Sequence, residues 1–409
     1  MMQIPWLAAI ALVFGAPNAQ AVPGAAAPPA AAVTQPEAED TEAAAKATDS
    51  VGVPQRWPVR QACTTTDDSP SCATLRAEAI GGYRYARVGG DTATEFDLDR
   101  ADAGLGLVWR HSALIDGGVN WGVEAIRSAG PQSLIGVDGD SMVVRMLEAY
   151  GHGALHAGPV DVGVRVGLLP ERWVEQVSKG YDLRGIDALT SDRLLFDRSD
   201  LGATLTASAL NGMVELDLQY VNGEGQAQRE QNTGKNSTVM LTVRPLMLES
   251  ASGPTTLALH AAYRDGSLGV ASVQNHRAAG AVTFASRYGY AGAEYVRATG
   301  VEGQPERRST VLGFWASGHL LAPYLGLLFK FDRVDQDTSV EDATVTRLTA
   351  GVFSDLFPYV ERNLRRLRLH AAYRRESYGD AAGPLPGAPE ASLTHSLLIT
   401  LQASGLHRF

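Results

Sequence analysis

The chain has 409 residues, of which 45% are hydrophobic and 20% charged, and its formal net charge is −10. This acidity argues against a nucleic-acid partner, which would favour a basic face. After the N-terminus no stretch approaches the roughly 20 apolar residues of a transmembrane helix, but a membrane strand shows an apolar side chain only at every second position, so a barrel is not excluded.

Residues 1–21 are predicted to form a secretory signal peptide. An apolar run extends from Ile4 to Phe14 and is followed by the sequence AQA, a small-x-small cleavage pattern. No Lys or Arg precedes the apolar run, which departs from the usual signal. A buried N-terminal helix is the alternative, but low-complexity sequence follows at once, so we expect export.

Residues 22–73 are predicted to form a periplasmic arm. Residues 22–60 are rich in Ala, Pro, Glu and Thr, a composition that cannot bury enough surface to fold. Cys63 and Cys72 flank a short polar loop, and in an exported chain such a pair predicts one disulfide. Two unpaired thiols are the alternative, and two ligands are too few for a structural zinc site.

From residue 74 to residue 409 the sequence consists of alternating segments separated by Gly, Asp, Asn and Pro. In "GMVELDLQYVNG", Val214, Leu216 and Leu218 share one parity, while Glu215 and Asp217 share the other. This alternation predicts strands with one apolar and one wet face. We predict about sixteen strands, near residues 75–87, 96–110, 118–128, 142–155, 159–168, 200–209, 212–222, 237–246, 255–265, 277–286, 288–298, 310–318, 323–333, 345–355, 364–376 and 394–409. The expected fold is all-β: a closed, transmembrane, antiparallel up-and-down barrel, because an open edge in hydrocarbon would leave backbone groups unpaired.

The run "PVDVGVRVGLLP" at residues 159–170 predicts which face of the strands is wet. Its valines share one parity, and Asp161 and Arg165 take the other. A charge that faces lipid at the midplane costs about 2–4 kcal/mol, so the charged parity must face a water-filled lumen. The same rule gives the candidate lumen-lining charges Glu78, Arg84, Asp161, Arg165, Glu215, Asp217, Arg244, Arg264, Glu294, Lys330, Asp332, Arg366, Arg368 and Arg374.

The connections between the predicted strands alternate in length. Those after odd-numbered strands are expected to be long and polar, and those after even-numbered strands, such as "HAGP", "ALNG" and "SRYG", are expected to be tight. This asymmetry is typical of outer-membrane barrels, which carry short turns at one rim and long loops at the other. Aromatic side chains near the ends of odd strands predict a girdle at the lipid–water interface: Tyr85, Tyr220, Tyr263, Tyr295, Phe331 and Tyr373.

The C-terminal run "HSLLITLQASGLHRF" resembles the terminal signal of bacterial outer-membrane proteins. Leu397, Ile399 and Leu401 share parity with the terminal Phe409. We therefore expect localisation in a bacterial outer membrane, contact with its lipid, and recognition of Phe409 by the barrel assembly machinery.

The middle of the chain resembles the phosphate-selective porin O and P family. The resemblance rests on "VRVGLLPERW", "RLLFDRSDLGATLTASALNGMVELDLQYVNGEG", "TVRPL" and "GAEYVRA", and it covers most of residues 142–409. It implies sixteen strands, a homotrimer and a third long loop folded into the pore. The third long connection here is residues 169–199, and the candidate constriction residues in it are Arg172, Lys179, Arg184, Asp187, Arg193 and Arg198. An external loop that never enters the pore is the alternative.

The sequence therefore predicts a porin for passive diffusion of small ions or solutes, with no cofactor, no metal and no enzymatic activity. Cationic rings select anions and acidic rings select cations; because both signs are present, anions such as phosphate remain only candidates. Arg366, Arg368 and Arg374 come nearest to an arginine ladder, although an ordinary wet face would look the same.

The alternatives are a lipase-like or protease-like barrel and a structural or adhesive barrel. The histidines His260, His370 and His395 are scattered, which weakens the enzyme. His152 with His156, and Asp138 with Asp140, give weak metal signals.

Overall fold

The structure is a computed structural model that describes residues 71–408, apart from residues 89–90, 113, 129–140, 197, 224–233, 249–253, 268–273, 287, 302–303, 322–323, 357–365 and 384–392. Residues 1–70, with Cys63, and the terminal Phe409 lie outside this range. The signal peptide, the arm, the Cys63–Cys72 disulfide and the terminal assembly signal therefore stay predictions.

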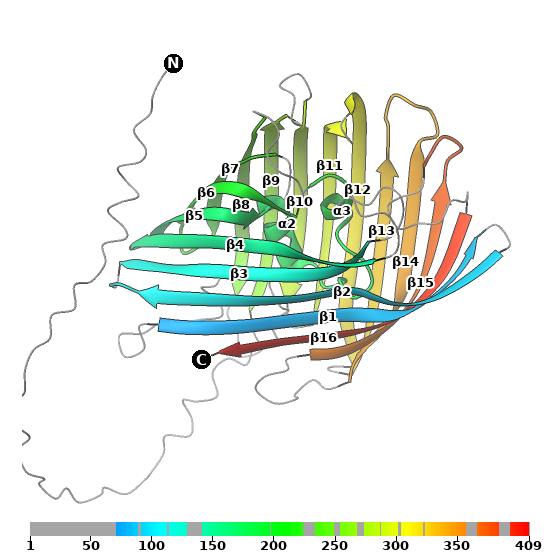
Figure 1. Cartoon of the computed structure of the whole chain (residues 1–409), viewed down its shortest axis with the longest axis horizontal. Helices are drawn as coiled ribbons and strands as arrows, with labels where there is room; N and C mark the ends of the chain where they lie inside the picture. Colours follow the sequence, from blue (N-terminus) through cyan, green and yellow to red (C-terminus); the bar gives the residue numbers. More distant parts are fainter. Residues whose placement is uncertain are drawn as a thin grey trace, which may run out of the picture. The chain divides into compact units, whose positions relative to one another are not determined.

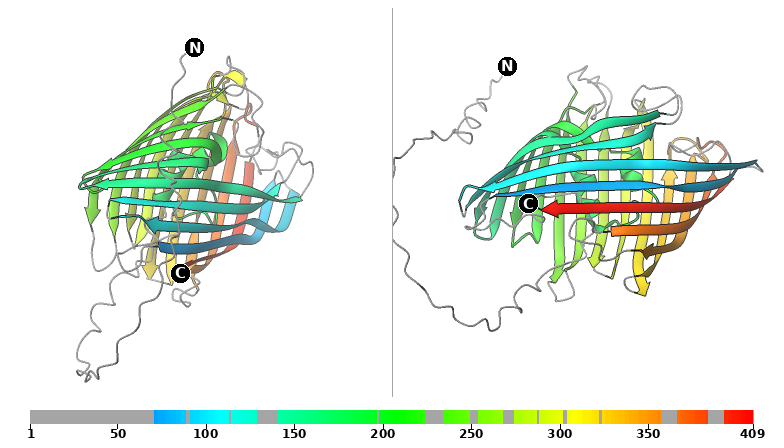
Figure 2. Two further views of the ribbon diagram at one scale, coloured as in Figure 1. Left: turned by 60° about the vertical axis from the view of Figure 1, so that its left-hand side comes forward. Right: turned by 60° about the horizontal axis from the view of Figure 1, so that its bottom comes forward.

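Sixteen antiparallel strands form a closed barrel in which each strand pairs with its sequence neighbours and β1 pairs with β16 (Figures 1 and 2). The strands are β1 (Ser71–Val88), β2 (Asp91–Arg110), β3 (Ile115–Ser128), β4 (Ser141–Ala157), β5 (Val160–Pro170), β6 (Ser199–Ala209), β7 (Val214–Val221), β8 (Asn236–Leu248), β9 (Thr255–Gly266), β10 (His276–Ser286), β11 (Gly289–Val301), β12 (Gln304–Leu321), β13 (Leu325–Asp335), β14 (Thr344–Asp355), β15 (Arg366–Tyr378) and β16 (Leu393–Arg408). The predicted fold class is confirmed, and all sixteen predicted strands are present.

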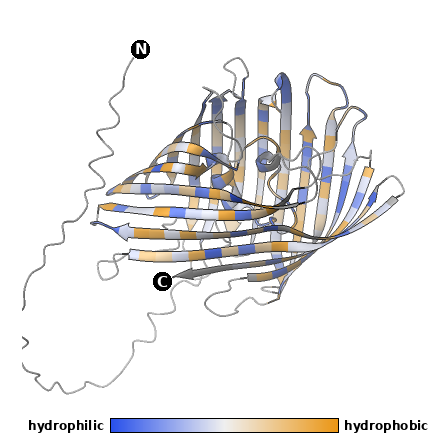
Figure 3. Ribbon diagram, viewed as in Figure 1, coloured by the Kyte–Doolittle hydropathy of each residue, from blue (hydrophilic) through white to orange (hydrophobic). Residues whose placement is uncertain are grey.

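The period-two alternation places apolar side chains on the outer face of the barrel. On β5 the valines are exposed, with Val164 at 48% and Val166 at 51%, whereas Asp161 and Arg165 lie on the opposite, inward face. Apolar and polar residues alternate along most strands (Figure 3). Leu216, Leu259, Leu327 and Leu397 continue the exposed apolar face on β7, β9, β13 and β16.

The tight turn predicted at "ALNG" is present between β6 and β7. Leu210 and Asn211 both have positive φ angles, 55° and 56°, and Gly212 follows at 85°. Two consecutive residues with positive φ match the twist of paired strands, which explains why Asn and Gly stand here.

The predicted alternation of connection lengths is wrong at three places. Residues 89–90 alone separate β1 from β2, and residues 302–303 alone separate β11 from β12, where we expected long loops; residues 356–365 separate β14 from β15, where we expected a tight turn. In the first two cases, residues that we had assigned to loops continue the antiparallel pairing of the two strands. Val88 lies opposite Asp91, and Val301 lies opposite Gln304. Antiparallel strands need only two residues to reverse direction, so a ladder can continue past the apolar band.

The predicted aromatic residues lie on the outer face. Tyr220, Tyr263 and Tyr295 are 56%, 53% and 51% exposed, and Tyr85 and Tyr373 are also exposed. The sixth predicted residue, Phe331, is half-buried, with its ring centre 6.2 Å from that of a neighbouring phenylalanine.

The connection between β5 and β6 contains the helices α2 (Arg172–Val177), η2 (Ser178–Gly180) and α3 (Thr190–Leu194), which lie within the ring of strands (Figure 1). We call residues 171–198 the inner segment; most of its described residues are buried. Among the described residues, no helix combines the length and apolarity required to cross a membrane.

Candidate functional site: the charged barrel interior

The charges predicted to line the interior lie on the inward face of their strands. Asp217, Arg264, Glu294, Lys330, Asp332, Arg368, Arg374 and Glu78 are buried, while Arg84, Asp161, Arg165, Glu215 and Arg244 are half-buried. The side chain of Arg366 lies outside the described residues, as does that of Arg193 in the inner segment. The remaining predicted inner-segment charges are buried (Arg172, Asp187) or half-buried (Lys179, Arg184, Arg198).

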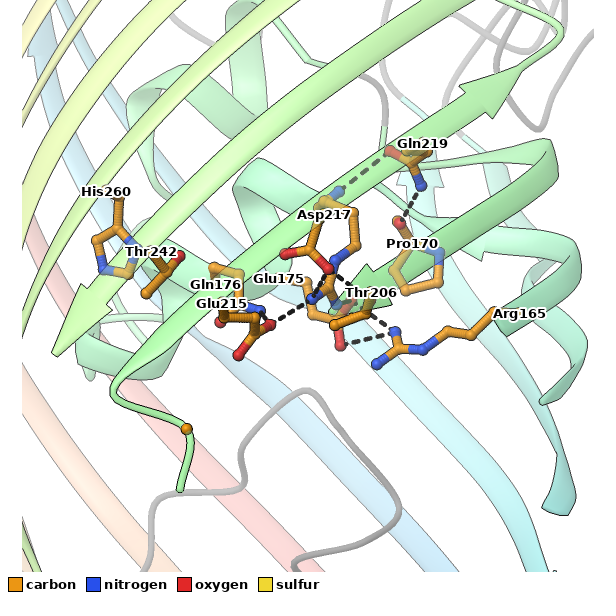
Figure 4. A network of polar contacts seen from close by, with 12 residues as sticks. Arg165, Pro170, Glu175, Gln176, Thr206, Glu215, Asp217, Gln219, Thr242 and His260 are labelled. Carbon is orange, nitrogen blue, oxygen red and sulfur yellow. Dashed lines mark hydrogen bonds and ion pairs between the residues drawn. The ribbon is translucent and has the colours of Figure 1, made fainter. Parts of the chain in front are cut away.

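Arg172 joins the start of the inner segment to the wall at β7, where Figure 4 shows Glu215 and Asp217. Its Nη2 donates to Glu215 at 2.8 Å and to Asp217 at 2.7 Å, and its Nη1 donates to Glu175 in the next helical turn. Glu175 also accepts from Arg165 of β5 at 2.9 Å. The Arg165 that the sequence predicted to be wet therefore faces inward and is paired with the inner segment.

Asp187 is the point where the inner segment contacts the most cations. Its carboxylate lies 3.1 Å from Lys330 Nζ, 3.1 Å from Arg347 Nη1 and 3.4 Å from Arg374 Nη2. These three side chains come from the neighbouring strands β13, β14 and β15, and all four groups are buried. A buried carboxylate is stable when it is paired and hydrogen-bonded, so Asp187 holds the middle of the segment against this wall.

Two further polar contacts lie on either side of Asp187. Arg368 Nη1 donates to Asp182 at 2.7 Å, and its Nε and Nη2 donate to Asp355 at 2.6 and 2.8 Å. At α3, the backbone N–H and the hydroxyl of Ser191 donate to Glu294 of β11, at 3.2 and 2.5 Å. The wall thus presents both signs of charge, and the inner segment supplies a complement to each.

Apolar packing supports the same docking. Trp173, Val177 and Tyr181 of the inner segment are at most 1% exposed and belong to one core with wall residues of β8 and β10–β15. The rings of Tyr181 and Trp315 meet edge to face at 5.4 Å, and Trp315 Nε1 donates to the carbonyl of Gly180 at 2.8 Å. Aromatic pairs in this geometry add about 0.5–1.5 kcal/mol beyond their burial.

A cavity of about 260 Å³ remains beside the inner segment, against β1, β2, β3, β15 and β16. Its charged lining consists of five arginines and three carboxylates: Arg84, Arg100, Arg184, Arg198, Arg374, Glu95, Asp187 and Asp192. The cavity is therefore lined by more positive than negative groups.

Burial lowers the pKa of two basic side chains of the inner segment. Burial lowers the pKa of Lys179 to about 8, against the raising effect of Glu215 and Glu175. Burial, with the nearby positive charge of Arg100, also lowers the pKa of Arg184. Among the described residues, Arg184 Nη2 has no hydrogen-bond partner, so this guanidinium is held in the cavity with one donor unused.

The sequence prediction missed a second group of inward charges, on β1 to β4. Arg76 pairs with Glu148 across the interior. Glu124 accepts from Arg145 at 2.7 Å and from Arg198 of the inner segment at 2.8 Å. An extra residue on β4, opposite Gly122/Val123, changes the parity of that strand, so that Arg145 and Glu148 both face inward although they stand three positions apart. Arg76 has the same parity as Glu78, so simple alternation could have found it.

Arg347 was also missed, because the alternation around it is mixed. It stands in "TVTRLTAG", where Arg347 shares its parity with Val345 and Thr349, and Thr346 shares the other parity with Leu348. A segment with an apolar residue on its inward face and a threonine on its outward face gives a weaker signal than a clean alternation of charged and apolar residues.

The histidines that the sequence offered as candidates for a catalytic site do not contact one another in the contacts that follow. His260 lies between Thr242 and Thr283 at 3.1 and 3.0 Å, and His370 lies 3.2 Å from Thr400. No group of three or more His, Cys, Asp or Glu side chains among the described residues could hold a metal ion.

The other residues considered for an enzyme or a metal site are His156, His395 and the pair Asp138 and Asp140. His156 lies between Asp161 and Asp116, at 2.5 and 2.7 Å, and His395 contacts Tyr373 on the outer face. Asp138 and Asp140 lie outside the described residues.

Comparison with models of known protein families found no match, and comparison with curated proteins found no relative. Among solved structures, the chain is similar to OmpF of Salmonella typhi in complex with daunomycin, with a TM-score of 0.58 and 13% identity over 83% of this chain and 100% of that chain. It is also similar to an anion-selective porin from Comamonas acidovorans (TM-score 0.55, 13% identity, 82% of this chain and 99% of that one). A third is OmpT of Vibrio cholerae in a trimer form (TM-score 0.52, 13% identity, 81% and 99%). These likenesses show a porin-type barrel fold, and the resemblance to the phosphate-selective family stays a prediction.

Proposed function

We propose that this protein is an outer-membrane channel through which small solutes diffuse passively, and that the inner segment narrows its pore. The observation that carries the proposal is the sorting of the sixteen strands into an apolar outer face and a charged inner face around a remaining cavity. A barrel of about sixteen strands is wide enough to leave an aqueous passage, whereas one of about eight is filled by its own side chains.

The contacts of the inner segment explain how it would act as a sieve. Charged contacts at Arg172 and Asp187, and the packing of Trp173 and Tyr181, hold it against one side of the wall. Solutes then pass on the other side, through the cavity against β1, β2, β3, β15 and β16. A loop fixed at both charged and apolar contacts gives a passage of constant size, which passive sieving requires.

The charge of the cavity supports a preference for anions. Five arginines face three carboxylates there, and an excess of cationic groups in a pore lowers the barrier for anions. The guanidinium fork also matches the geometry of phosphate oxygens, so phosphate belongs to the anions that we propose as permeants.

We further propose that the barrel is a homotrimer inserted by the assembly machinery through Phe409. Of the similar solved structures, OmpT of Vibrio cholerae is described as a trimer form. Chemical cross-linking of the protein in detergent micelles tests this assignment.

The purified protein, reconstituted into a planar bilayer, is expected to give discrete conductance steps. Across a potassium chloride gradient the reversal potential should have the sign of chloride selectivity, because of the arginine excess in the cavity. Replacing chloride by phosphate at equal ionic strength measures the phosphate permeability directly. Silence in the bilayer would contradict the channel, and a cation-selective reversal potential would contradict the anion preference.

Lys179 follows Ser178, which lines the cavity, so its charge should make this preference depend on pH. Because burial holds its pKa at about 8, its positive charge is lost between about pH 7 and pH 9, and the reversal potential should move toward zero. A lysine pKa below its ordinary value costs stability while the group is charged, and this cost is relieved as the pH rises from about 8 toward the ordinary lysine pKa, so the segment stays docked. Lys179→Arg keeps the charge over this range; a pH step of equal size in that variant would show that Lys179 is not its source.

A further inference from the structure

The outer face carries arginines just beyond its aromatic residues, at the rim where the odd strands end. Arg87, Arg297, Arg333 and Arg375 each follow an outward-facing aromatic residue by two positions on the same strand. All four side chains are exposed. The structure gives none of these guanidinium groups an ion pair or hydrogen bond within the described part of the chain.

Two of these arginines lie near each other where β1 pairs with β16 to close the barrel. His395 of β16 lies opposite Arg87 of β1 and opposite Arg375 of β15, so the three residues form one row across three neighbouring strands. Adjacent strands are about 4.8 Å apart, which places the two arginine backbones about 10 Å from each other. Tyr373 contacts His395, with ring centres 5.9 Å apart. We call these four residues the seam cluster.

The same composition occurs a second time on the outer face. Arg297 of β11 and Arg308 of β12, with His276 and Tyr263, line a surface hollow of about 270 Å³. The rings of Tyr263 and His276 stack at 6.5 Å. We call these four residues the hollow cluster; Asp265 is paired with its His276 at 2.9 Å, and the exposed Glu306 stands two positions before Arg308 on β12.

Each cluster combines groups that bind phosphate with an adjoining surface that binds hydrocarbon. Two guanidinium forks and an imidazole supply donors for phosphate oxygens, and the tyrosine belongs to a lipid–water interface. Directly below the seam cluster, Leu397, Ile399 and Leu401 continue the exposed apolar face. On the outward face of β15, β16 and β1, no described residue is an Asp or Glu that could compete for the arginines.

From this arrangement we infer that the seam and hollow clusters bind the phosphorylated headgroup of a lipid in the outer leaflet. The inference rests on the proposed insertion of the barrel in an outer membrane, whose long-loop rim faces outward. A lipid is favoured over free phosphate because the basic groups adjoin the apolar face, so one ligand places its phosphates on the arginines and its acyl chains on the leucines.

Native mass spectrometry of the full chain in detergent, with bisphosphorylated lipid A as the probe, tests the inference. The wild type should bind two lipid molecules per chain, and the affinity should exceed that for phosphatidylcholine at least tenfold. The double variant Arg87→Gln/Arg375→Gln should lose one bound lipid per chain, as should Arg297→Gln/Arg308→Gln. Arg333→Gln is the matched control: it removes an exposed arginine from the same rim, where the strand neighbours are Leu312 and Thr346.

Three outcomes would overturn the inference. These are equal binding of lipid A and phosphatidylcholine, a loss in Arg333→Gln as large as in the double variants, and full displacement of lipid A by millimolar inorganic phosphate. Conductance of the same preparations separates this test from that of the proposed function. Double variants that conduct normally but still bind two lipids refute the headgroup sites alone, whereas a silent wild type refutes the channel.

Discussion

Replacing Asp187 with asparagine is expected to release the inner segment and to raise the single-channel conductance. The substitution removes the carboxylate that Lys330, Arg347 and Arg374 share, and leaves three buried cations with less compensation. Removal of one partner of a buried ion pair costs about 3–5 kcal/mol. Such a cost raises the population of the undocked segment more than about a hundredfold, because about 1.4 kcal/mol corresponds to a factor of ten.

Single-channel recording and limited proteolysis measure this effect together. We expect a larger and noisier conductance, a stronger preference for anions, and new cleavage within residues 171–198. Asp337→Asn is the matched control, because this carboxylate lies in the connection between β13 and β14 and accepts hydrogen bonds from Ser339. A variant at Asp187 with unchanged conductance and an uncleaved segment would show that the three cations do not hold the segment in place.

The strands could be predicted from the sequence because their pattern is local. On β5 and β7 every second residue is apolar, and a buried or lipid-facing surface on one side of a strand imposes that period. The inward direction of Arg165, Asp217 and Lys330 follows from the same parity. Prediction failed where the parity changes, between Arg145 and Glu148 on β4, since a bulge adds one residue that no periodicity announces.

The partners of the inner segment could not be predicted because they are distant in sequence. Asp187 lies 143 positions from Lys330 and 160 from Arg347. The sequence shows many acids in the segment and many bases on the wall, and nothing in their spacing decides which of them meet. Only closure of the barrel, which brings β13, β14 and β15 opposite the start of β6, selects these pairs.

Reversing the charge of Arg184 is expected to abolish the anion preference while leaving the fold intact. The lining of the cavity would change from five arginines and three carboxylates to four of each, so that neither sign prevails. Arg184 is suited to this test because its Nη2 has no hydrogen-bond partner among the described residues, and few favourable contacts are lost with it. The nearby carboxylates of Glu78 and Asp102 act on Arg184 over a distance and would repel a glutamate moderately.

The reversal potential of Arg184→Glu across a potassium chloride gradient should fall close to zero, with a phosphate permeability reduced at least as strongly as that of chloride. Phosphate should suffer more because its double charge feels the local potential twice as strongly as chloride does. Arg184→Lys keeps the charge but loses the planar fork, so it should preserve the chloride preference and lower phosphate permeability alone. If Arg184→Glu instead retained the selectivity of the wild type, ions would have to cross the barrel by a route that avoids this cavity, and the cavity charges on β1, β2 and β15 would have no part in permeation.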